Sequence, residues 1–555
     1  MRFSNYIGYL LFVIVVLVQQ RFNSESFAAT PYLGKMNRYE VSEMLNLNGK
    51  ELRLPDNTTL VVKDGGGFTN GKVIGNNIRI ISADNVIFAS SVETQFENTY
   101  LKSCWYKELL ACITGNSKCT IEITEGEYSI NNPIYIRITN SLYGKGNVLI
   151  KHNHSFSVGD DVTIQGISWD GQNKAAYWMY CQPNRMTIRN CSFKNYYGTS
   201  AGIIYWSHSE RDTEGLLIEN CTFGMVGAKE NGVIGDMDGS STVIYTYRCS
   251  NVTIRNNMFK DQYGNEDSDA IKMEGVRIDE PKHFPLPSGE DYRYGVINAI
   301  VEGNEFLNVP KSPVKIFASE VTIRSNKMSY RGEVKTAIAR MFRGENILVE
   351  SNVAECADAV SNAIEVHSCR NVRLNKNNVS STGNGGKPFG ELLKIENCVN
   401  VNVTELNITM STSSMSNTNQ SLVRLSGKDI TIKNSRFQTP YSYYGIYAPL
   451  GIDGLIMEKN TIEVTRGIQY AFLVNNAVKE PKGTCTFNKC TFKLAAEEID
   501  DATSYGAAFA HRIIVKNCVF DYAKGITLNA EKVKVKRSKA KKFNIQERNS
   551  VERNR

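Results

Sequence analysis

The chain lacks the cysteine spacing that marks a structural metal site. It has 13 cysteines among 555 residues, but no CxxC pair occurs, which excludes a metal framework of that kind. Cys104, Cys112 and Cys119 lie close together and could include a disulfide, although the spacing fixes no pairing. We expect the cysteines inside the repeats described below to be small buried side chains.

Long apolar runs are missing beyond the N-terminus. The apolar residues 10–18 follow Arg2 and precede the small-residue stretch 26–28, an order typical of a secretory signal peptide, which we assign to residues 1–28. A single membrane span is the alternative, but the run is shorter than the about 20 apolar residues that a span needs. We therefore predict a secreted, periplasmic or cell-surface protein with no stable membrane span in the mature chain.

Net charge is absent from most of the chain. The residues from Glu531 onward account for the whole formal net charge of +7, so the rest of the chain is neutral. We interpret residues 531–555 as a basic C-terminal tail that begins with a last strand and ends in solvated residues. This interpretation is preferred to a docking site for an anionic partner.

What the sequence does contain is a repeat between Arg185 and Tyr522. Each copy has a short β-branched run, a polar pair and then an aromatic or aliphatic residue, as in residues 186–193 and 216–223. Most copies lie about 22–30 residues apart, a period typical of solenoid coils. The second residue of the polar pair is, in successive copies, Cys191, Cys221, Asn257, Asn304, Asn326, Asn352, Asn377, Leu406, Ser435, Asn460, Cys490 and Cys518.

The repeat predicts an all-β fold, a right-handed parallel β-helix with an N-terminal helical cap. The copies are not separated by helical periodicity, and their inward positions mix Ile, Val, Phe and Met rather than the fixed leucines of a leucine-rich repeat. In a β-helix each coil stacks on the last at roughly 4.8 Å, so the polar pairs form a turn ladder that satisfies backbone groups. We place the β-helix at residues 151–530. Irregular first coils and a cap segment occupy 29–150, in which residues 100–114 have helical spacing and form a cap or a lateral helix.

Three segments before the repeats resemble the entry segment of pectate-lyase-like β-helix proteins: residues 120–130, 133–136 and 142–146. Together with the coils that follow, the resemblance covers most of the chain. It implies the β-helix fold but leaves the activity open, because this superfamily contains lyases, hydrolases, epimerases, phage tailspikes and adhesins.

A second short strand precedes each ladder position, and its alternation predicts which side chains point outward. Aromatic faces stack on sugar rings, and Lys or Arg binds carboxylates, so this outward column predicts a saccharide groove with an acidic subsite. The alternative is that exposed strands carry these residues for solubility. The outward column is Trp178, Tyr205, Tyr245, Lys272, Lys315, Arg340, Glu365, Lys394, Arg424 and Tyr447, of which Trp178, Tyr205, Tyr245, Arg340, Glu365 and Lys394, together with His367, are the predicted substrate-binding residues.

The longest insertion follows Asn257 and places a group of carboxylates beside this column. Asp267 and Asp269 belong to this insertion, and Asp236 and Asp238 come from the preceding coil. Such a group can bind Ca²⁺ through oxygen ligands or supply the acid and nucleophile of a glycosidase. The same residues are also common in turns, where they cap and bend the backbone. Ca²⁺ is therefore the cofactor that the sequence suggests.

Three functions remain open. In β-elimination from a uronic acid, Lys272 would be the base if Lys315 and Arg340 on successive coils lowered its pKa, and similar lyases use Lys or Arg in this role. The predicted catalytic residues are Lys272, Lys315, Arg293 and Asp269. A hydrolase would use Asp267 and Asp269 with Glu274 or Glu365, but the Gly-His-Gly of polygalacturonase-like enzymes is missing, which places it second.

The third function is a non-catalytic adhesin or glycan-binding solenoid. It explains the aromatic residues equally well, but it gives no reason for carboxylates and lysines to meet at one long loop. In all three cases the expected partner is a polysaccharide, most simply an acidic one, and no nucleic acid is expected.

Overall fold

The computed structural model describes residues 38–547 except 132–135, 182, 199, 206–212, 231–232, 235–239, 265–267, 275–295, 332–333, 358–359, 382–388, 412–419, 450–451, 475–482 and 496–506. The predicted signal peptide, residues 1–28, lies outside this range. The chain divides into two units, Met1–Lys194 and Asn195–Arg555, which are described separately. Within the described residues, no helix is long and apolar enough to cross a membrane.

Unit 1 consists of short parallel strands from Arg38 onward. Arg38 pairs with Thr59, and Thr59 pairs with Arg79, so equivalent residues of successive coils lie side by side. The first coils contain β1 (Arg38–Val41), β2 (Met44–Asn46), β3 (Glu51–Arg53), β4 (Thr59–Val62), β5 (Gly67–Thr69), β6 (Gly71–Asn76), β7 (Arg79–Ile81) and β8 (Val92–Glu97). The later coils contain β9 (Tyr100–Lys102), β10 (Thr120–Ile123), β11 (Gly126–Ile130), β12 (Ile136–Ile138), β13 (Ser141–Gly144), β14 (Val148–His152), β15 (Phe156–Val158), β16 (Thr163–Gln165), β17 (Ser168–Asp170), β18 (Tyr177–Tyr180) and β19 (Met186–Arg189).

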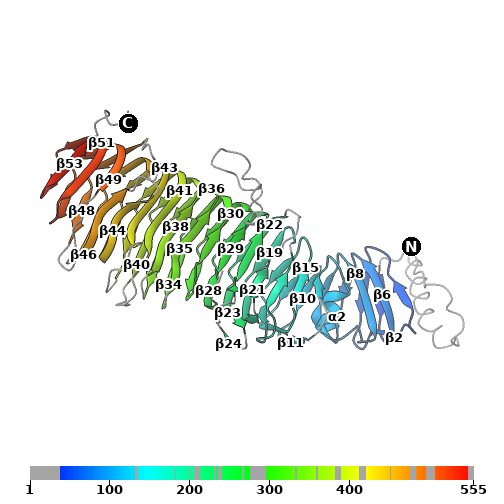
Figure 1. Ribbon diagram of the computed structural model, residues 1–555. Helices are drawn as coiled ribbons and strands as arrows, with labels where there is room; N and C mark the ends of the chain where they lie inside the picture. The colour runs from blue at the N-terminus through cyan, green and yellow to red at the C-terminus, as the bar shows by residue number, and fades with distance from the viewer. Residues whose placement is uncertain are drawn as a thin grey trace, which may run out of the picture. The chain divides into compact units, whose positions relative to one another are not determined.

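The predicted helical cap is not present as a cap. Residues 100–114 form β9, the short 3-10 helix η1 (Ser103–Trp105) and the α-helix α2 (Leu109–Thr114), and parallel coils both precede and follow them. Leu109, Cys112 and Ile113 bury one side of α2. The helix is therefore a lateral element inserted in a coil, which was the other form that the helical spacing allowed (Figure 1).

Unit 2 has three columns of parallel strands, visible in Figure 1 as successive coils. The first contains β21 (Ser200–Tyr205), β26 (Ile244–Tyr247), β29 (Ile271–Glu274), β32 (Val314–Ile316), β35 (Val334–Phe342), β38 (Val360–His367), β41 (Glu391–Thr404) and β43 (Ser421–Lys433). The second contains β22 (Thr213–Glu219), β27 (Cys249–Arg255), β30 (Val296–Glu302), β33 (Ala318–Arg324), β36 (Glu345–Glu350), β39 (Arg370–Asn375), β45 (Ile452–Glu458), β47 (Thr484–Asn488), β49 (Ala507–Lys516) and β51 (Ile526–Lys536). The third contains β23 (Thr222–Glu230), β28 (Met258–Tyr263), β31 (Glu305–Leu307), β34 (Lys327–Tyr330), β37 (Val353–Cys356), β40 (Asn378–Ser381), β42 (Asn407–Thr409), β44 (Arg436–Ala448), β46 (Thr461–Val474), β48 (Thr491–Leu494), β50 (Val519–Tyr522) and β52 (Lys539–Ala540), and β53 (Phe543–Glu547) ends the described chain.

The pairing of each strand with its counterpart one coil later confirms the parallel β-helix. Strands β41 and β43 run through the corner between the first two columns, and β44 and β46 continue from the third column into the first. The C-terminal strand expected after Glu531 is also present, because β51 continues to Lys536 and pairs with β49. Right-handed winding stays a prediction.

The polar pairs form the predicted ladder inside unit 2. The backbone N–H of Asn326 donates to Asn352 Oδ1 at 3.0 Å, and the backbone N–H of Asn352 donates to Asn377 Oδ1 at 3.1 Å. Asn352 Nδ2 also donates to the backbone oxygen of Ile323 at 3.0 Å. All three asparagines are buried, so their side chains satisfy backbone groups that water cannot reach.

The first residue of each pair makes the bend. Ser325 and Ser351, which precede two ladder asparagines, have φ angles of 54° and 55°, and Asn256 has a φ of 55°. Short polar residues tolerate this left-handed backbone better than β-branched ones do. The inward residues between the bends are aliphatic or aromatic, and Phe223, Phe259 and Phe306 stack one above another.

The cysteines are all free. The possibility of a disulfide among Cys104, Cys112 and Cys119 is therefore not realised, and Cys112 and Cys119 are buried. Cys369 and Cys398 occupy equivalent positions in neighbouring coils, where the backbone N–H of Cys369 donates to Cys398 Sγ at 3.4 Å. Burial raises the pKa of both thiols, as expected for cysteines that act as small core side chains.

The ladder leads to a stability prediction. Replacing Asn352 by Leu leaves the backbone N–H of Asn326 and the backbone oxygen of Ile323 buried without their partner. We expect a loss of about 1–3 kcal/mol in the free energy of unfolding, measured by denaturant titration. Asn402→Leu, at an exposed strand position, is the matched control and should change stability by less than about 0.5 kcal/mol. Equal effects of the two substitutions would contradict the ladder's energetic role.

Candidate functional site

The predicted outward column is a continuous line of in-register residues in unit 2. Tyr245 pairs with Lys272, Lys272 with Lys315, and Lys315 with Arg340. In the following coils, each residue again pairs with the next one in the series Arg340, Glu365, Lys394, Arg424 and Tyr447. The predicted register is therefore confirmed from Tyr205, which pairs with Tyr245, to Tyr447.

Trp178 does not belong to an exposed surface. Its side chain is 0 % exposed and packs in the core of unit 1 between Trp169 and Phe193, with ring centroids 5.3 and 5.0 Å away. Its predicted role in binding substrate is wrong, because a fully buried ring cannot contact a polysaccharide. In β18 the two consecutive residues Trp178 and Met179 are both buried, whereas Tyr177 is half-buried and Tyr180 is exposed.

Tyr205 and Tyr245 are placed together, but they do not present open ring faces. Their rings lie 5.0 Å apart, and the ammonium of Lys272 lies 5.4 Å from the centre of the Tyr245 ring. Tyr245 is 4 % exposed and its hydroxyl donates to Glu274 Oε2 at 2.6 Å. Burial, followed by the Glu274 carboxylate, raises the pKa of Tyr245 well above its usual range. Stacking of a sugar on the Tyr245 face, as predicted, is therefore not supported.

The cations of the column are matched by carboxylates, so the column is not a stripe of uncompensated positive charge. Lys272 Nζ lies 3.0 Å from Glu274, and Lys315 Nζ lies 3.7 Å from Asp269. The repulsion by Lys315 and Arg340 that was expected to make Lys272 a neutral base is offset by these contacts. The physical reason for choosing Lys272 as the catalytic base is therefore wrong.

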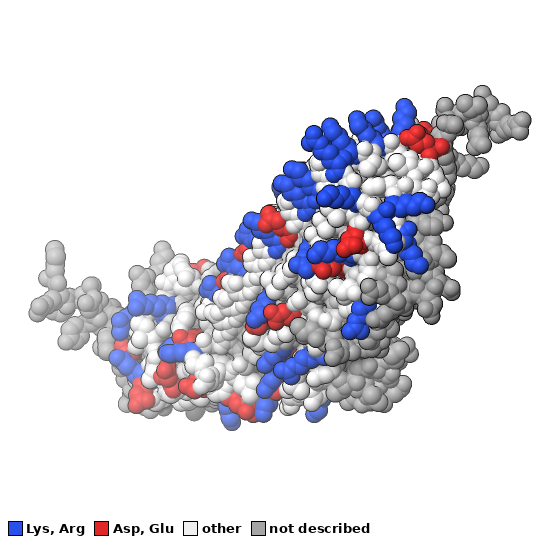
Figure 2. All heavy atoms as spheres, turned by 90° about the vertical axis from the view of Figure 1, so that its left-hand side faces the viewer, with Lys and Arg blue, Asp and Glu red and all other residues white. Residues whose placement is uncertain are grey.

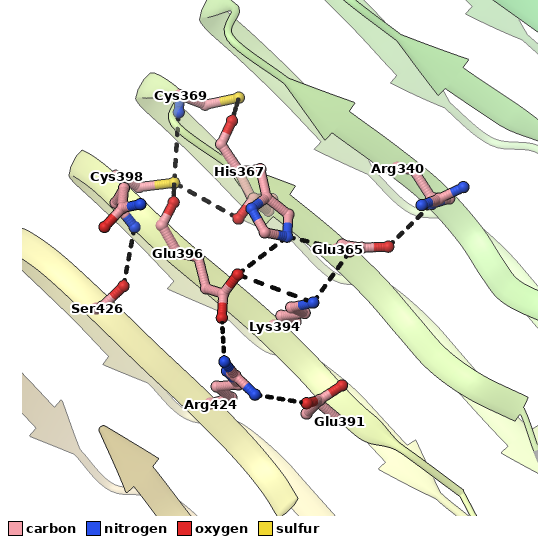
Figure 3. A network of polar contacts seen from close by, with 12 residues as sticks. Arg340, Glu365, His367, Cys369, Glu391, Lys394, Glu396, Cys398, Arg424 and Ser426 are labelled. Atoms are coloured by element: carbon pink, nitrogen blue, oxygen red, sulfur yellow. Dashed lines mark hydrogen bonds and ion pairs between the residues drawn. The ribbon is translucent and has the colours of Figure 1, made fainter. Parts of the chain in front are cut away.

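The centre of the site is Glu365, whose two oxygens hold different groups (Figure 3). Glu365 Oε2 accepts a hydrogen bond from Arg340 Nε at 2.9 Å. Glu365 Oε1 lies 3.1 Å from His367 Nε2 and 3.3 Å from Lys394 Nζ. Burial alone would raise the pKa of this carboxyl group, but His367, Arg340 and Lys394 together hold the pKa well below its usual range. Glu365 is therefore an ionised carboxylate that orients its neighbours.

His367 is held by two carboxylates. Its Nε2 lies 3.1 Å from Glu365 and 3.1 Å from Glu396, and its ring stacks on Phe342 with centroids 5.3 Å apart. Carboxylates accept hydrogen bonds, so Nε2 is the ring nitrogen that donates to them, and Nδ1 is the ring nitrogen left for another contact. The side chain is 24 % exposed, and among the described residues no partner is recorded for Nδ1.

Arg340 uses only part of its guanidinium in this network. Nε contacts Glu365, and the guanidinium lies 5.2 Å from the centre of the Phe342 ring. Its terminal nitrogens have no hydrogen-bond partner within the described part of the chain. Two terminal guanidinium nitrogens without such partners suit a bidentate contact to a carboxylate.

The network continues to the next coils, where two carboxylates that the sequence reasoning missed, Glu391 and Glu396, contact cations of the predicted column. Arg424 contacts Glu391 at 2.8 Å and Glu396 at 2.6 Å, and Lys394 lies 3.8 Å from Glu396. Glu396 follows Lys394 by two residues, as His367 follows Glu365, so strand alternation places both on the outer face. This two-residue spacing is the sequence signal from which Glu396 could have been predicted.

The predicted calcium ligands cannot be assembled from the described residues. Asp236, Asp238, Asp267 and Arg293 lie outside them. Asp269 is described, is 0 % exposed and lies 3.7 Å from Lys315. No group of three or more His, Cys, Asp or Glu able to hold a metal ion occurs in the described residues, and Ca²⁺ binding stays a prediction.

Comparisons with known proteins leave the family open. No family model matches the sequence, and no curated protein matches it. Among solved structures, a double mutant of the tailspike protein of E. coli bacteriophage HK620, in complex with a pentasaccharide, is matched with 8% sequence identity and a TM-score of 0.26. The match covers 88% of this chain and 72% of the tailspike chain. At this TM-score the match carries no argument, and the fold rests on the strand pairing described above.

The ionised state of Glu365 predicts how stability depends on pH. Its folded pKa is lowered, so its contribution to stability is fully present above the unfolded pKa of about 4.3 and is lost as the pH falls toward the folded pKa. Glu365→Gln should therefore lower the melting temperature at pH 7, and the difference from wild type should shrink below about pH 4. Exposed Glu355→Gln is the control and should show a small, pH-independent difference. If the melting temperatures of all three proteins depended on pH in the same way, Glu365 would not be the ionised carboxylate described above.

Proposed function

We propose that the charged column of unit 2 binds an acidic polysaccharide and that the residues around Glu365 cleave it by β-elimination. The observation that carries the proposal is the pair of groups held by one carboxylate. Glu365 holds the guanidinium of Arg340 with one oxygen and the imidazole of His367 with the other. An anion clamp and a base are thus fixed beside each other.

The chemistry assigns one task to each group. Arg340 would bind the uronate carboxylate and neutralise it, which makes the hydrogen on the adjacent carbon more acidic. His367 Nδ1 would take that proton, the carbon–carbon double bond would form, and the glycosidic carbon–oxygen bond would break. The leaving oxygen needs a proton, for which Lys394 is suitably held because it touches the same carboxylates as His367. No water is consumed, and His367 replaces Lys272 as the base.

Hydrolysis fits these residues less well. A glycosidase needs a carboxylic acid whose pKa is raised so that it can protonate the leaving group. The pKa of Glu365 is shifted in the opposite direction. A non-catalytic glycan-binding protein would use the same column, and the experiments below separate it from the lyase.

The direct test is incubation of the purified protein with a panel of uronate-containing polysaccharides while the absorbance of the unsaturated product is recorded. We expect His367→Ala to lower the rate of unsaturated product formation by about 10²–10⁴-fold, because the base is lost. Binding of the polysaccharide should change little. His154→Ala, at an exposed position in unit 1, is the control and should retain the wild-type rate.

Either of two other results would contradict the lyase proposal and identify a different function. New reducing ends without unsaturated product would identify a hydrolase. Saturable binding to one polysaccharide, with neither kind of product from any member of the panel, would identify a glycan-binding protein.

The clamp is tested separately by Arg340→Lys. Lysine keeps the charge but loses the bidentate geometry, so affinity for the carboxylated polysaccharide should fall by about 10-fold. Affinity for the same polysaccharide after chemical reduction of its carboxylates should not change between variant and wild type. The control is Arg373→Lys, at an exposed position away from the column, which should leave both affinities intact. A loss that is equal for both polysaccharides would remove Arg340 from carboxylate recognition.

A further inference from the structure

A second outward column of unit 2 alternates in charge over five successive coils, from Glu219 to Glu350. It lies one residue before each bend, and its members pair in register. Arg255 contacts Glu219 at 2.7 Å, and Arg324 contacts Glu302 at 2.6 Å. Stacked positions in a sheet are close enough for opposite charges to stabilise and like charges to destabilise. The column begins Glu219, Arg255, Glu302, Arg324, Glu350.

This rule fails in the last two coils. Lys516 pairs directly with Lys536, and four residues earlier in the same two strands Arg512 pairs with Lys532. Earlier in the same column Lys433 meets Glu458 at 3.3 Å, so opposite charges are still matched a few coils before the end. The final coils instead place like charges side by side.

The exposed cations continue around the last bend, and we call them the basic rim. They have no recorded ion pair among the described residues, and the two acids at the ends of this segment have other partners. Glu531 lies 2.7 Å from His511, and Glu547 accepts a hydrogen bond from the backbone N–H of Val533 at 2.9 Å. The basic rim is Lys532, Lys534, Lys536, Arg537, Lys539, Lys541 and Lys542, all exposed.

Figure 2 is consistent with this surface. Lys and Arg side chains gather at the top of its view, at the height that the last strands occupy in Figure 1, with few Asp or Glu side chains among them. Such a gathering of uncompensated positive charge attracts anions and is sensitive to salt.

We propose that the basic rim binds an acidic polysaccharide chain, independently of the reaction at Glu365. The rim passes from β51 through the left-handed residue Arg537, with a φ of 51°, to β52. A flexible polyanion can follow that bend, whereas a flat membrane meets only one face. Within the described part of the rim no exposed aromatic side chain is available for the base stacking that single-stranded nucleic acids use, since Tyr522 is 2 % exposed and the half-buried Phe543 packs edge-on against Phe520. Carboxylate or sulfate groups spaced along a glycan therefore fit best.

The competing explanation is protection of the last strands against pairing with another molecule, a common role of lysine at a sheet edge. That role needs charge, but it does not need like charges stacked on the preceding coil as well. The two explanations differ in what happens when the charge is removed.

The test is the triple variant Lys534→Gln, Lys536→Gln and Lys539→Gln, with heparin and polygalacturonate as probes in a direct binding assay. We expect at least about 10-fold weaker binding than wild type at low salt, and a wild-type affinity that falls steeply from about 50 to 200 mM salt. The matched control replaces exposed Lys260, Lys327 and Lys376 by Gln and should keep the wild-type affinity. Unchanged affinity with new self-association would overturn the proposal in favour of edge protection. Tighter binding to anionic lipid vesicles or to DNA than to either glycan would overturn the choice of partner.

A second variant separates binding from folding. Lys536→Glu restores the alternation opposite Lys516, so it should raise the melting temperature slightly while weakening heparin binding. Weaker binding together with a raised or unchanged melting temperature supports the proposal, and unchanged binding overturns it. The rate at which unsaturated product forms from a short uronate oligosaccharide should be the same for the rim variants and wild type. A failure of the proposal for the rim can therefore be distinguished from a failure of the proposal for Glu365.

Discussion

The structure of unit 2 depends on the bend at which each strand ends. A residue with a left-handed backbone turns the chain, and the following Asn, Ser or Cys is buried. The asparagines reach back to the preceding coil and accept a hydrogen bond from its backbone N–H, as Asn352 does for Asn326. This hydrogen bond fixes the register between coils, because a slip of one residue would exchange the inner and outer faces of a strand. Every column of side chains, inside and outside, follows from that register.

In-register stacking imposes a rule on the outer surface. Each side chain lies beside the side chain at the equivalent position of the next coil, so a charged residue meets its neighbour whether or not the two attract. Before the last two coils, the protein brings opposite charges together in two ways. In the column that begins at Glu219 the sign alternates between coils, whereas around Glu365 the opposite charges also come from positions two residues away in the same strand, as Glu396 does for Lys394.

The fold and one column of the site were predictable because equivalent positions of a repeat become neighbours in space. The register from Tyr245 to Tyr447 required only the alignment of the repeats. The prediction for Trp178 failed because β18 does not alternate there: the consecutive side chains of Trp178 and Met179 are both buried, so the alternation rule does not identify an outward residue. The partners of the cations were missed because the column was examined alone, without the positions two residues before and after, which share its face. The insertion after Glu274 has no counterpart in other coils, so the repeat gives no register for Arg293.

The alternating column also constrains how such a chain can change in length. If the coil that carries Arg324 were removed, Glu302 would come to lie beside Glu350, and two carboxylates would replace an attractive contact. Removal or duplication of two successive coils would preserve the order of signs. Growth and shortening of this region in evolution should therefore be tolerated more easily in steps of two coils than in steps of one, although each coil by itself is a complete structural repeat.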